Sequence, residues 1–471
     1  MPPQLAAFVF AGVILGLFWL DRDERDRSSP FLWVAVLWIA LACSRSASQW
    51  LNLGVPMDVS DALLEGDPTN RLTYSVLLLL GLAVLAARSR RVYRVLSSQK
   101  LVIAFFGYCL LSLLWSEFPS VGFKRWTKAV GDLVMVLIVL TDRNPAGALK
   151  RLLSRITFLL IPLSVLFIKY YPDFGRSYGR WEGEVHYTGV TTNKNSLGSL
   201  CLLFGLASLW RLLGSNTCGE GPGRRRRQIA HAIILAIVVW LFWMVNSMTS
   251  LSCFLLVGTV LFAVKFWHAA RRPAVMHRLI AGAVVVALFA LFVAPELLVY
   301  IGRSATLTDR TGIWGLAVGL TPSSVVGAGY ESFWLGPRLA KIWSVYVWGP
   351  LEAHNGYLEI FLNLGMVGCA LLGAVLVAGY RSVMAGFCGG GVSGSLMLAF
   401  FVSGVIYNFT EAAYFRMMTP SWIFLLLALM GASLAPWRVR ADSRLGGTVP
   451  QNVVNVATEQ RGRTVLEGNA N

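Results

Sequence analysis

The chain is poor in charge. Of its 471 residues only 14% are Asp, Glu, Lys or Arg, whereas 56% are hydrophobic. A soluble protein of this size would carry about 25% charged residues, so the shortage excludes an ordinary soluble class. Repeated apolar runs of about 17–25 residues, each long enough to cross a hydrocarbon core of about 30 Å, predict an all-α, polytopic membrane protein. No separate soluble domain is large enough to build its own core.

Cysteine is also scarce, and its pattern excludes further chemistry. The seven cysteines are scattered, mostly within apolar runs, and no pair has the spacing of a metal site. We interpret them as small apolar residues. The sequence also lacks a convincing cleavable signal, because Pro2–Leu20 is followed by DRDERDR and not by a small-residue cleavage site. We expect that segment to be a retained first span.

The apolar runs predict about 12 transmembrane helices, with a range of about 11–13 because the second, the fifth and the last two runs are the weakest. The candidate spans are 4–20, 30–46, 71–87, 100–116, 127–141, 151–171, 193–213, 228–246, 248–268, 275–299, 355–380, 394–412 and 417–434.

Charge sets the expected orientation. The net charge is +17, and most Lys and Arg lie in one alternate set of loops, including the run Arg224–Arg227. Because such loops stay in the cytoplasm, we interpret the charge as a topology signal and expect no nucleic-acid partner. This threading places the large polar loop, 300–354, on the outer side and the C-terminus inside. We expect 1–435 to be a transmembrane catalytic domain and 436–471 a disordered cytoplasmic tail.

Lys and Arg are disfavoured in outward loops, so those that occur there are informative. A guanidinium binds phosphate oxygens through a fork of charge-assisted hydrogen bonds, so we expect these side chains to bind a diphosphate. The outward cations form three groups: Lys124, Arg125 and Lys128; Arg176, Arg180 and Lys194; and Arg303, Arg310, Arg338 and Lys341 in the large loop.

His354 is the outward histidine best suited to acid–base chemistry. It lies at the start of a span, and an imidazole with an ordinary pKa near 6.5 can accept a proton from a hydroxyl near neutral pH. Hydrogen bonding at the membrane interface is the alternative role. After it, Asn355, Glu359 and Asn363 recur every four residues and so are expected to share one helix face.

Two carboxylates in apolar surroundings need an explanation. A charge at the bilayer centre costs about 2.5–3.5 kcal/mol, so Glu359, about one turn inside a span, should face the bundle interior. Glu411, with Arg416 at the outward end of a late span, is a second such case. These carboxylates are too few and too far apart in sequence to indicate a metal site.

Three segments of the large loop carry a family resemblance. LTDRTGIW (Leu307–Trp314), P-x4-G-x-GY-x2-FW (Pro322–Trp334) and AHNGYLE-x4-LG-x2-G (Ala353–Gly368), in this order, resemble the O-antigen ligase and exopolysaccharide polymerase family, and most closely its exopolysaccharide-polymerase branch. LLWSEFPSVGFKRW and GVTTNKNSLG support the resemblance, which runs from about Leu110 to Glu411.

The resemblance implies a metal-independent and cofactor-free glycosyltransferase of the all-helical, GT-C type in the bacterial inner membrane, with its active-site loops facing the periplasm. The implied donor is an oligosaccharide on undecaprenyl diphosphate, and the hydroxyl of an acceptor glycan or glycolipid attacks its anomeric carbon. A flippase and a chain-length regulator are the implied protein partners. His354 matches the histidine at the reaction centre, and Arg310 matches the arginine that holds the diphosphate.

Other residues match the family more loosely, and Thr192 departs from it, because it stands where many members have a histidine. The further candidate ligands of the diphosphate or substrate are Arg125, Lys124, Arg180 and Lys194. The candidate supporting residues are Asn355, Glu359, Glu411 and Tyr330.

Three functions remain open at this point. A polymerase would transfer the growing glycan to the next lipid-linked repeat unit, and an O-antigen ligase would transfer it to a lipid A core or a protein. These two enzymes differ only in the acceptor. A transporter or flippase of lipid-linked sugars is the alternative from a different class. It would need paired broken helices and repeat symmetry, whereas the polar residues here concentrate in outward loops.

Overall fold

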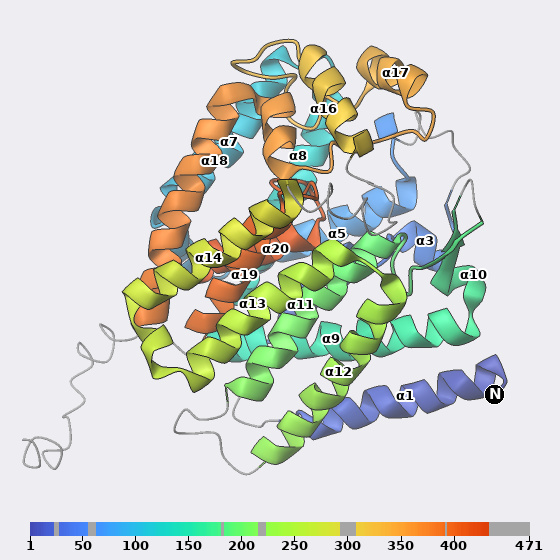
Figure 1. Ribbon diagram of the computed structural model, residues 1–471, viewed down its shortest axis with the longest axis vertical. Helices are drawn as coiled ribbons and strands as arrows, with labels where there is room; N and C mark the ends of the chain where they lie inside the picture. Colours follow the sequence, from blue (N-terminus) through green and yellow to red (C-terminus); the bar gives the residue numbers. More distant parts are fainter. Residues whose placement is uncertain are drawn as a thin grey trace, which may run out of the picture.

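The structure is a computed structural model, and most of the chain that it describes is helical (Figure 1). The expected all-α class is therefore confirmed. The predicted disordered tail, 436–471, lies outside the described residues. The described residues are 1–22, 28–54, 63–179, 183–214, 223–292, 308–390 and 393–432, and the side chains of 290–292 and 308–311 are not among them.

The helices of the first half are α1 (Pro3–Leu20), α2 (Leu32–Ala42), α3 (Ala47–Leu51), α5 (Pro68–Ala86), α6 (Ser89–Ser97), α7 (Lys100–Leu111), α8 (Pro119–Leu140), α9 (Pro145–Tyr170), α10 (Pro172–Gly175) and α11 (Lys194–Leu213). Those of the second half are α12 (Arg224–Val245), α13 (Met248–Phe266), α14 (Pro273–Phe292), α16 (Thr308–Gly319), α17 (Gly336–Val345), α18 (Gly356–Cys388), α19 (Gly394–Tyr407) and α20 (Pro420–Gly431). Two short strands, β1 (Arg176–Tyr178) and β2 (Val185–Tyr187), pair as an antiparallel hairpin.

Seven helices in the described part of the chain are long and apolar enough to cross a membrane. The number becomes eight if α6 and α7, which meet at a bend of 91°, form one span. Helices α2, α19 and α20 are apolar but shorter, as is the stretch Pro273–Phe289 of α14. These elements coincide with the expected spans, so the polytopic class is confirmed. The number of about 11–13 spans stays a prediction.

Several helix boundaries differ from their expected places, and the start of α8 is the one that concerns the site. The helix expected over 127–141 begins earlier, at Pro119. Proline suits the first position of a helix, because the N–H that it lacks would have no partner there. Lys124 and Arg125, expected to lie before the span, therefore lie on α8 itself. This places the Arg125 guanidinium on a rigid helix.

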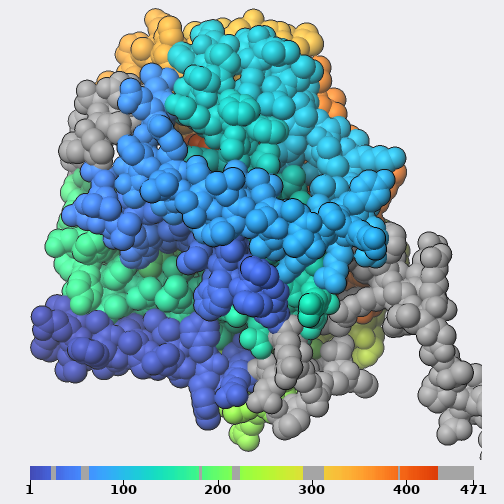
Figure 2. All heavy atoms as spheres, turned by 180° about the vertical axis from the view of Figure 1, so that it is seen from behind, coloured from blue at the N-terminus to red at the C-terminus, as the bar shows by residue number. Residues whose placement is uncertain are grey.

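The centre of the bundle is formed by helices that are apolar on every face. Helix α11 packs against α12 and α13, and α19 packs against α20. The most apolar stretch of α11 is 78% buried, whereas that of α1 is only 11% buried. Figure 2 shows α1 (dark blue) as a ridge along the lower edge of one face, apart from the α5–α7 region. A helix that is apolar on every face belongs in a protein core or in lipid. Helix α11 is an example of the first case and α1 of the second.

The large loop has its own small core. Helices α16 and α17 lie together at the top of the molecule in Figure 1, next to the start of α18. Ile313, Phe333, Leu339, Ile342 and Leu362 belong to one buried apolar cluster, separate from the main core. The loop is therefore a folded cap whose position on α18 is fixed by packing.

Candidate active site

The glycine motifs of the large loop and of α18 meet in one joint. Helix α18 is broken at Gly365, which has φ 64° and ψ −164°, and residues 323–329 lie against the break. A Cβ on Gly365 would lie 2.2 Å from the Val325 carbonyl oxygen, and one on Gly327 would lie 2.4 Å from the Asn363 backbone. Both positions therefore require glycine, which explains why the two motifs occur together.

Backbone hydrogen bonds close this joint on both sides of the break. The amide of Ala328 donates to the carbonyl of Leu362 at 3.0 Å, before Gly365. The amide of Met366 donates to the carbonyl of Ser324 at 2.9 Å, after it. A broken helix leaves backbone groups without their usual partners, and the loop supplies them. The cap is thus fixed to the first turns of α18.

Glu359, about one turn into α18, ties the cap to the span. Its carboxylate accepts from the indole N–H of Trp334 at 2.9 Å and 3.0 Å, and from the amide of Ala353 at 2.6 Å. The Nδ2 of Asn363 donates to it at 3.3 Å. Glu359 therefore faces the protein interior, as expected. Because it holds Ala353, it also fixes the backbone next to His354.

His354 lies between two carboxylates that are distant in sequence. Its Nδ1 is 3.0 Å from an oxygen of Glu352 and 3.3 Å from an oxygen of Glu411. The other Glu411 oxygen accepts from Asn195 at 3.2 Å. We assign the ring proton to Nδ1, because carboxylates only accept, which leaves the Nε2 lone pair free to act as a base. The same carboxylates stabilise the positive charge that forms when Nε2 takes a proton.

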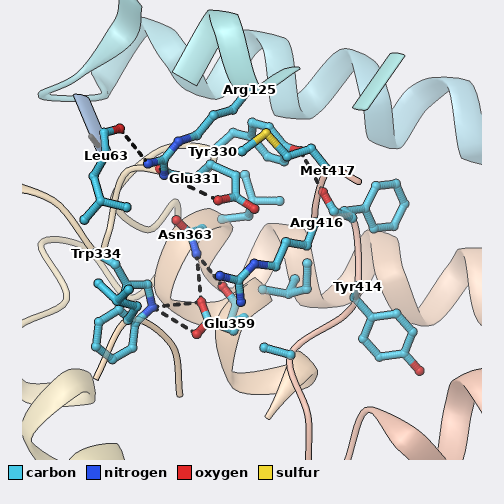
Figure 3. A pocket seen from close by; sticks show the side chains of 15 residues that line it. Leu63, Arg125, Tyr330, Glu331, Trp334, Glu359, Asn363, Tyr414, Arg416 and Met417 are labelled. Atoms are coloured by element: carbon cyan, nitrogen blue, oxygen red, sulfur yellow. Dashed lines mark hydrogen bonds and ion pairs between the residues drawn. The ribbon is translucent and has the colours of Figure 1, made fainter. Parts of the chain in front are cut away.

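A cavity of about 140 Å³ lies beside this group, and two arginines line it (Figure 3). Arg416, from the loop between α19 and α20, forms an ion pair with Glu352, the carboxylate that also contacts His354. Arg125, from α8, donates to the Glu331 carbonyl at 2.6 Å and lies 3.5 Å from the Glu331 carboxylate. The lining also includes Tyr330, Trp334, Glu359, Asn363 and Tyr414.

The two arginines influence each other electrostatically. Burial lowers the pKa of Arg416 from its ordinary value, the Glu331 carboxylate opposes that shift, and the charge of Arg125 adds to it. A guanidinium nevertheless stays charged at neutral pH. An anion with several oxygens placed between the two cations would relieve their repulsion and form paired hydrogen bonds. Because the Glu331 and Glu352 carboxylates already pair with these guanidiniums, a polyanionic group would bind here by replacing those carboxylates.

The backbone around the cavity is strained. Glu331, His354, Phe415 and Met418 have φ between 50° and 55°, a left-handed conformation that few non-glycine residues adopt. Such a residue costs about 1–3 kcal/mol and persists only where its surroundings hold it. The buried carboxylate of Asp132 supplies part of that hold, because it accepts from the Met418 amide at 2.9 Å. Strain of this kind is concentrated at sites whose geometry matters for function.

Several residues expected from the sequence come together here. Arg125, Tyr330 and Glu359 line the cavity, and Glu411 contacts His354. Tyr330 is buried and donates its hydroxyl to the Phe415 carbonyl at 2.6 Å, so its role is to hold the loop that carries Arg416.

Other expected site residues lie elsewhere. Lys124 is exposed on α8. Lys194 lines a different cavity, with its Nζ 3.5 Å from His186. Asn355, next to His354 in the chain, is the N-cap of α18, where its side chain accepts from the amides of the first turn.

The diphosphate roles of two arginines stay predictions. Arg310 belongs to α16, but its side chain lies outside the described set. Arg180 lies outside the described residues.

Glu352 and Arg416 are the main site residues that sequence reasoning missed. Glu352 stands two positions before His354 in LEAHNG, and that spacing was the available signal. Arg416 was grouped with Glu411, but it pairs with Glu352. Glu331 and Trp334 carried no such signal, because their contacts to Arg125 and Glu359 depend on the docked cap.

Sequence distance was also misleading about convergent carboxylates. Glu352, His354 and Glu411 each offer a ligand atom, and these atoms lie within 4.8 Å of one another, which is the spacing of a potential metal site. The sequence singled out Glu359 and Glu411, and it did not predict that Glu352 and Glu411 meet at His354. However, Arg416 already pairs with Glu352 and Asn195 donates to Glu411, so protein donors serve both carboxylates. Metal independence stays a prediction.

The fold and site together define a class: an all-α membrane bundle with a carboxylate-held imidazole beside an arginine-lined cavity under a folded cap. The chain is similar to the exopolysaccharide production protein ExoQ of Rhizobium meliloti (strain 1021), with 24% identity over 364 residues, which cover 73% of this chain and 79% of ExoQ. The similarity confirms the resemblance to exopolysaccharide-related proteins that the motifs indicated. No family model matches the chain.

Proposed function

We propose that the protein is a membrane glycosyltransferase that polymerises exopolysaccharide or O-antigen repeat units. It transfers a glycan from undecaprenyl diphosphate to an acceptor hydroxyl on the periplasmic side of the bacterial inner membrane. One observation carries this proposal: His354 is held by Glu352 and Glu411, and Glu352 pairs in turn with Arg416, which lines a cavity together with Arg125. The similarity to an exopolysaccharide production protein supports the class of product.

The donor diphosphate lies between Arg125 and Arg416, which line the same cavity. Arg310, on α16 of the cap, is the third cation of this set by family resemblance. Negative charge grows on the diphosphate as its bond to the sugar breaks. Fixed cations stabilise the transition state most where charge develops, so they lower the barrier more than they tighten ground-state binding.

His354 activates the acceptor. The acceptor hydroxyl gives its proton to Nε2, its oxygen forms a bond to the anomeric carbon, and the carbon–oxygen bond to the diphosphate breaks. The diphosphate leaves with the electron pair. A positioned base contributes about 10²–10⁴-fold to such a step. Because Glu352 contacts both His354 and Arg416, one carboxylate links the base to the cation that holds the leaving group.

Two other functions are the alternatives. A ligase differs from a polymerase only in the acceptor, whereas a transporter fits the site less well. A ligase would use the same donor cavity and the same base. A transporter would use the break in α18, but loop backbone fills that break, and the charged groups gather under the cap instead. The enzyme is therefore preferred, and the acceptor decides between polymerase and ligase.

A reconstituted reaction tests the proposal. Purified protein is supplied with a lipid-linked repeat unit, and product length is read on a gel. A ladder of products is expected from the polymerase. A single transfer that occurs only after a core lipid is added would identify a ligase. Absence of any glycan transfer, while the lipid-linked substrate changes membrane leaflet, would support the transporter and refute both enzymes.

Thiol labelling tests the orientation. Lys341, exposed on α17 of the cap, and Arg90, exposed on α6, lie in loops with opposite expected sides. In intact cells an impermeant thiol reagent should label Lys341→Cys and spare Arg90→Cys. The reverse pattern would place the cap in the cytosol and overturn the proposed periplasmic reaction.

A further inference from the structure

A second cavity, of about 440 Å³, opens where the β1–β2 hairpin meets the first turn of α11 and the end of α12. It shares no lining residue with the arginine-lined cavity. The side chains that give it chemical character are Glu184, His186, Tyr187, Lys194, Trp243 and Asn246.

Polar groups form a row along one wall of this cavity. The Nε2 of His186 lies 3.5 Å from the Nζ of Lys194 and 3.8 Å from a carboxylate oxygen of Glu184. An acid, an imidazole and an ammonium group side by side can donate and accept hydrogen bonds at several neighbouring hydroxyls. The described lining of the donor cavity has arginines in place of the histidine and lysine, so the two sites differ in chemistry.

Aromatic rings form the other part of the lining. Trp243 is 79% exposed. The Arg176 guanidinium lies over the ring of Tyr187, 5.9 Å from the ring centroid. A sugar ring presents an apolar C–H face and a rim of hydroxyls. It therefore matches a site that combines an exposed aromatic face with a few convergent polar groups.

The first turn of α11 connects this cavity to the imidazole. Lys194 and Asn195 are consecutive, so their side chains project about 100° apart around the helix. Lys194 lines the second cavity, while Asn195 donates to Glu411 at 3.2 Å. Glu411 in turn lies 3.3 Å from His354 Nδ1. The start of α11 therefore lies between the second cavity and His354, and Asn195 and Glu411 connect the two.

We propose that the second cavity is the subsite for the acceptor saccharide, with Trp243 as its stacking surface and Lys194 and His186 as its hydrogen-bonding groups. This inference rests on the proposed function. It gives the reaction two sides: the arginine-lined cavity takes the donor diphosphate, and the hairpin cavity takes the sugar that attacks. It also gives Lys194 a role different from the diphosphate ligand expected from the sequence.

The test uses two variants and two matched controls. Trp243→Ala and Lys194→Gln change the second cavity. Trp348→Ala and Lys100→Gln change an exposed tryptophan in the cap and an exposed lysine at the start of α7, and these two residues line neither cavity. The probes are the lipid-free oligosaccharide released by mild acid from the lipid-linked repeat unit, and undecaprenyl diphosphate as a donor-site inhibitor.

Both cavity variants should weaken calorimetric binding of the free oligosaccharide about tenfold or more, which corresponds to one lost contact of ordinary strength. They should raise the KM for the acceptor while kcat and the inhibition constant of undecaprenyl diphosphate stay within about twofold. The controls should match the wild type in every measurement. Normal oligosaccharide binding in both variants would overturn the proposal. A changed inhibition constant in Lys194→Gln would also overturn it, because Lys194 would then serve the donor.

Failure of the proposed function has a different signature. If His354→Ala retains glycan transfer while Trp243→Ala still loses oligosaccharide binding, the assignment of the base is wrong and the saccharide subsite stands. If His354→Ala loses transfer while both cavity variants bind the oligosaccharide normally, the base stands and the subsite is wrong.

Discussion

The protein contains two clusters of similar composition at distant places, and they differ in what surrounds them. In the first, the Asp21 carboxylate lies 3.0 Å from Arg211 and 3.4 Å from His231, and accepts from Ser154 at 2.6 Å. This cluster lies where α1 ends, at the lower end of the molecule in Figure 1. Like the site under the cap, it combines imidazole, guanidinium and carboxylate.

The second cluster is His354 with Glu352, Glu411 and Arg416. The His231 side chain is 3% exposed, whereas that of His354 is 23% exposed. The second cluster also adjoins the arginine-lined cavity through Arg416, and the backbone of its histidine has a left-handed conformation. The same residue types therefore serve as a structural tie where they are buried together, and as a chemical site where an open, strained edge faces a cavity.

The largest expected effect separates the two histidines. His354→Ala should lower glycan transfer by about 10²–10⁴-fold, because it removes the base but no buried packing. His231→Ala should lower the thermal stability of the purified protein and leave the transfer rate per folded molecule unchanged. Transfer rates and melting curves on the two variants check this. Equal loss of activity in both would remove the functional distinction between the clusters.

The next largest effect on the transfer rate is expected from the planar geometry of the Arg416 guanidinium. Arg416→Lys keeps the charge beside Glu352 but loses the planar fork, so transfer should fall about 10- to 100-fold with the fold intact. Arg211→Lys, the matched change at Asp21, should leave the rate within about twofold. Single-turnover rates at saturating donor measure both. An unchanged rate in Arg416→Lys would reduce that residue to an anchor for Glu352.

The sequence predicted what depends on local pattern. Apolar runs placed the spans, and the charge cost of Glu359 predicted that it faces inward, where it holds Trp334 and Ala353. His354 was found because it begins a span. The fold class and the centre of the site therefore follow from local features of the amino-acid sequence.

The contacts that the sequence did not predict join segments that are distant in the chain, and most of them form only when the cap is docked. Arg125 meets Glu331 only because the cap folds onto α18 through Gly327 and Gly365. The contact between Glu411 and His354 requires a loop from the far end of α19. No periodicity connects such segments. One-dimensional spacing also does not separate two cavities, and it grouped Lys194, which lines the second cavity, with the candidate diphosphate ligands.

Protonation of Asp21 should affect stability but not catalysis. Burial alone would raise the pKa of Asp21 above its ordinary value of 3.8, but the hydrogen bond with His231 and the charge of Arg211 lower it to about 2. The ionised group therefore contributes about 2 kcal/mol of stability above pH 3.8, and this is lost as pH falls towards about 2. Asp21→Asn should lower the melting temperature at pH 7, and the difference from wild type should shrink below about pH 4. If the difference in melting temperature stays constant across that pH range, the charge of Asp21 is not the source of the stabilisation.

The smallest expected effect is that of chelation. Glu352, His354 and Glu411 could offer three ligand atoms, but Arg416 and Asn195 already serve the two carboxylates. Removing divalent ions with a chelator should therefore leave the transfer rate within about twofold, and Mn²⁺ or Zn²⁺ should not restore His354→Ala. The cluster at Asp21 provides the reference, because His231→Ala should be equally insensitive. A rate that falls with the chelator and returns with one ion would turn the His354 cluster into a metal centre, in which His354 is a ligand and another group must take the proton.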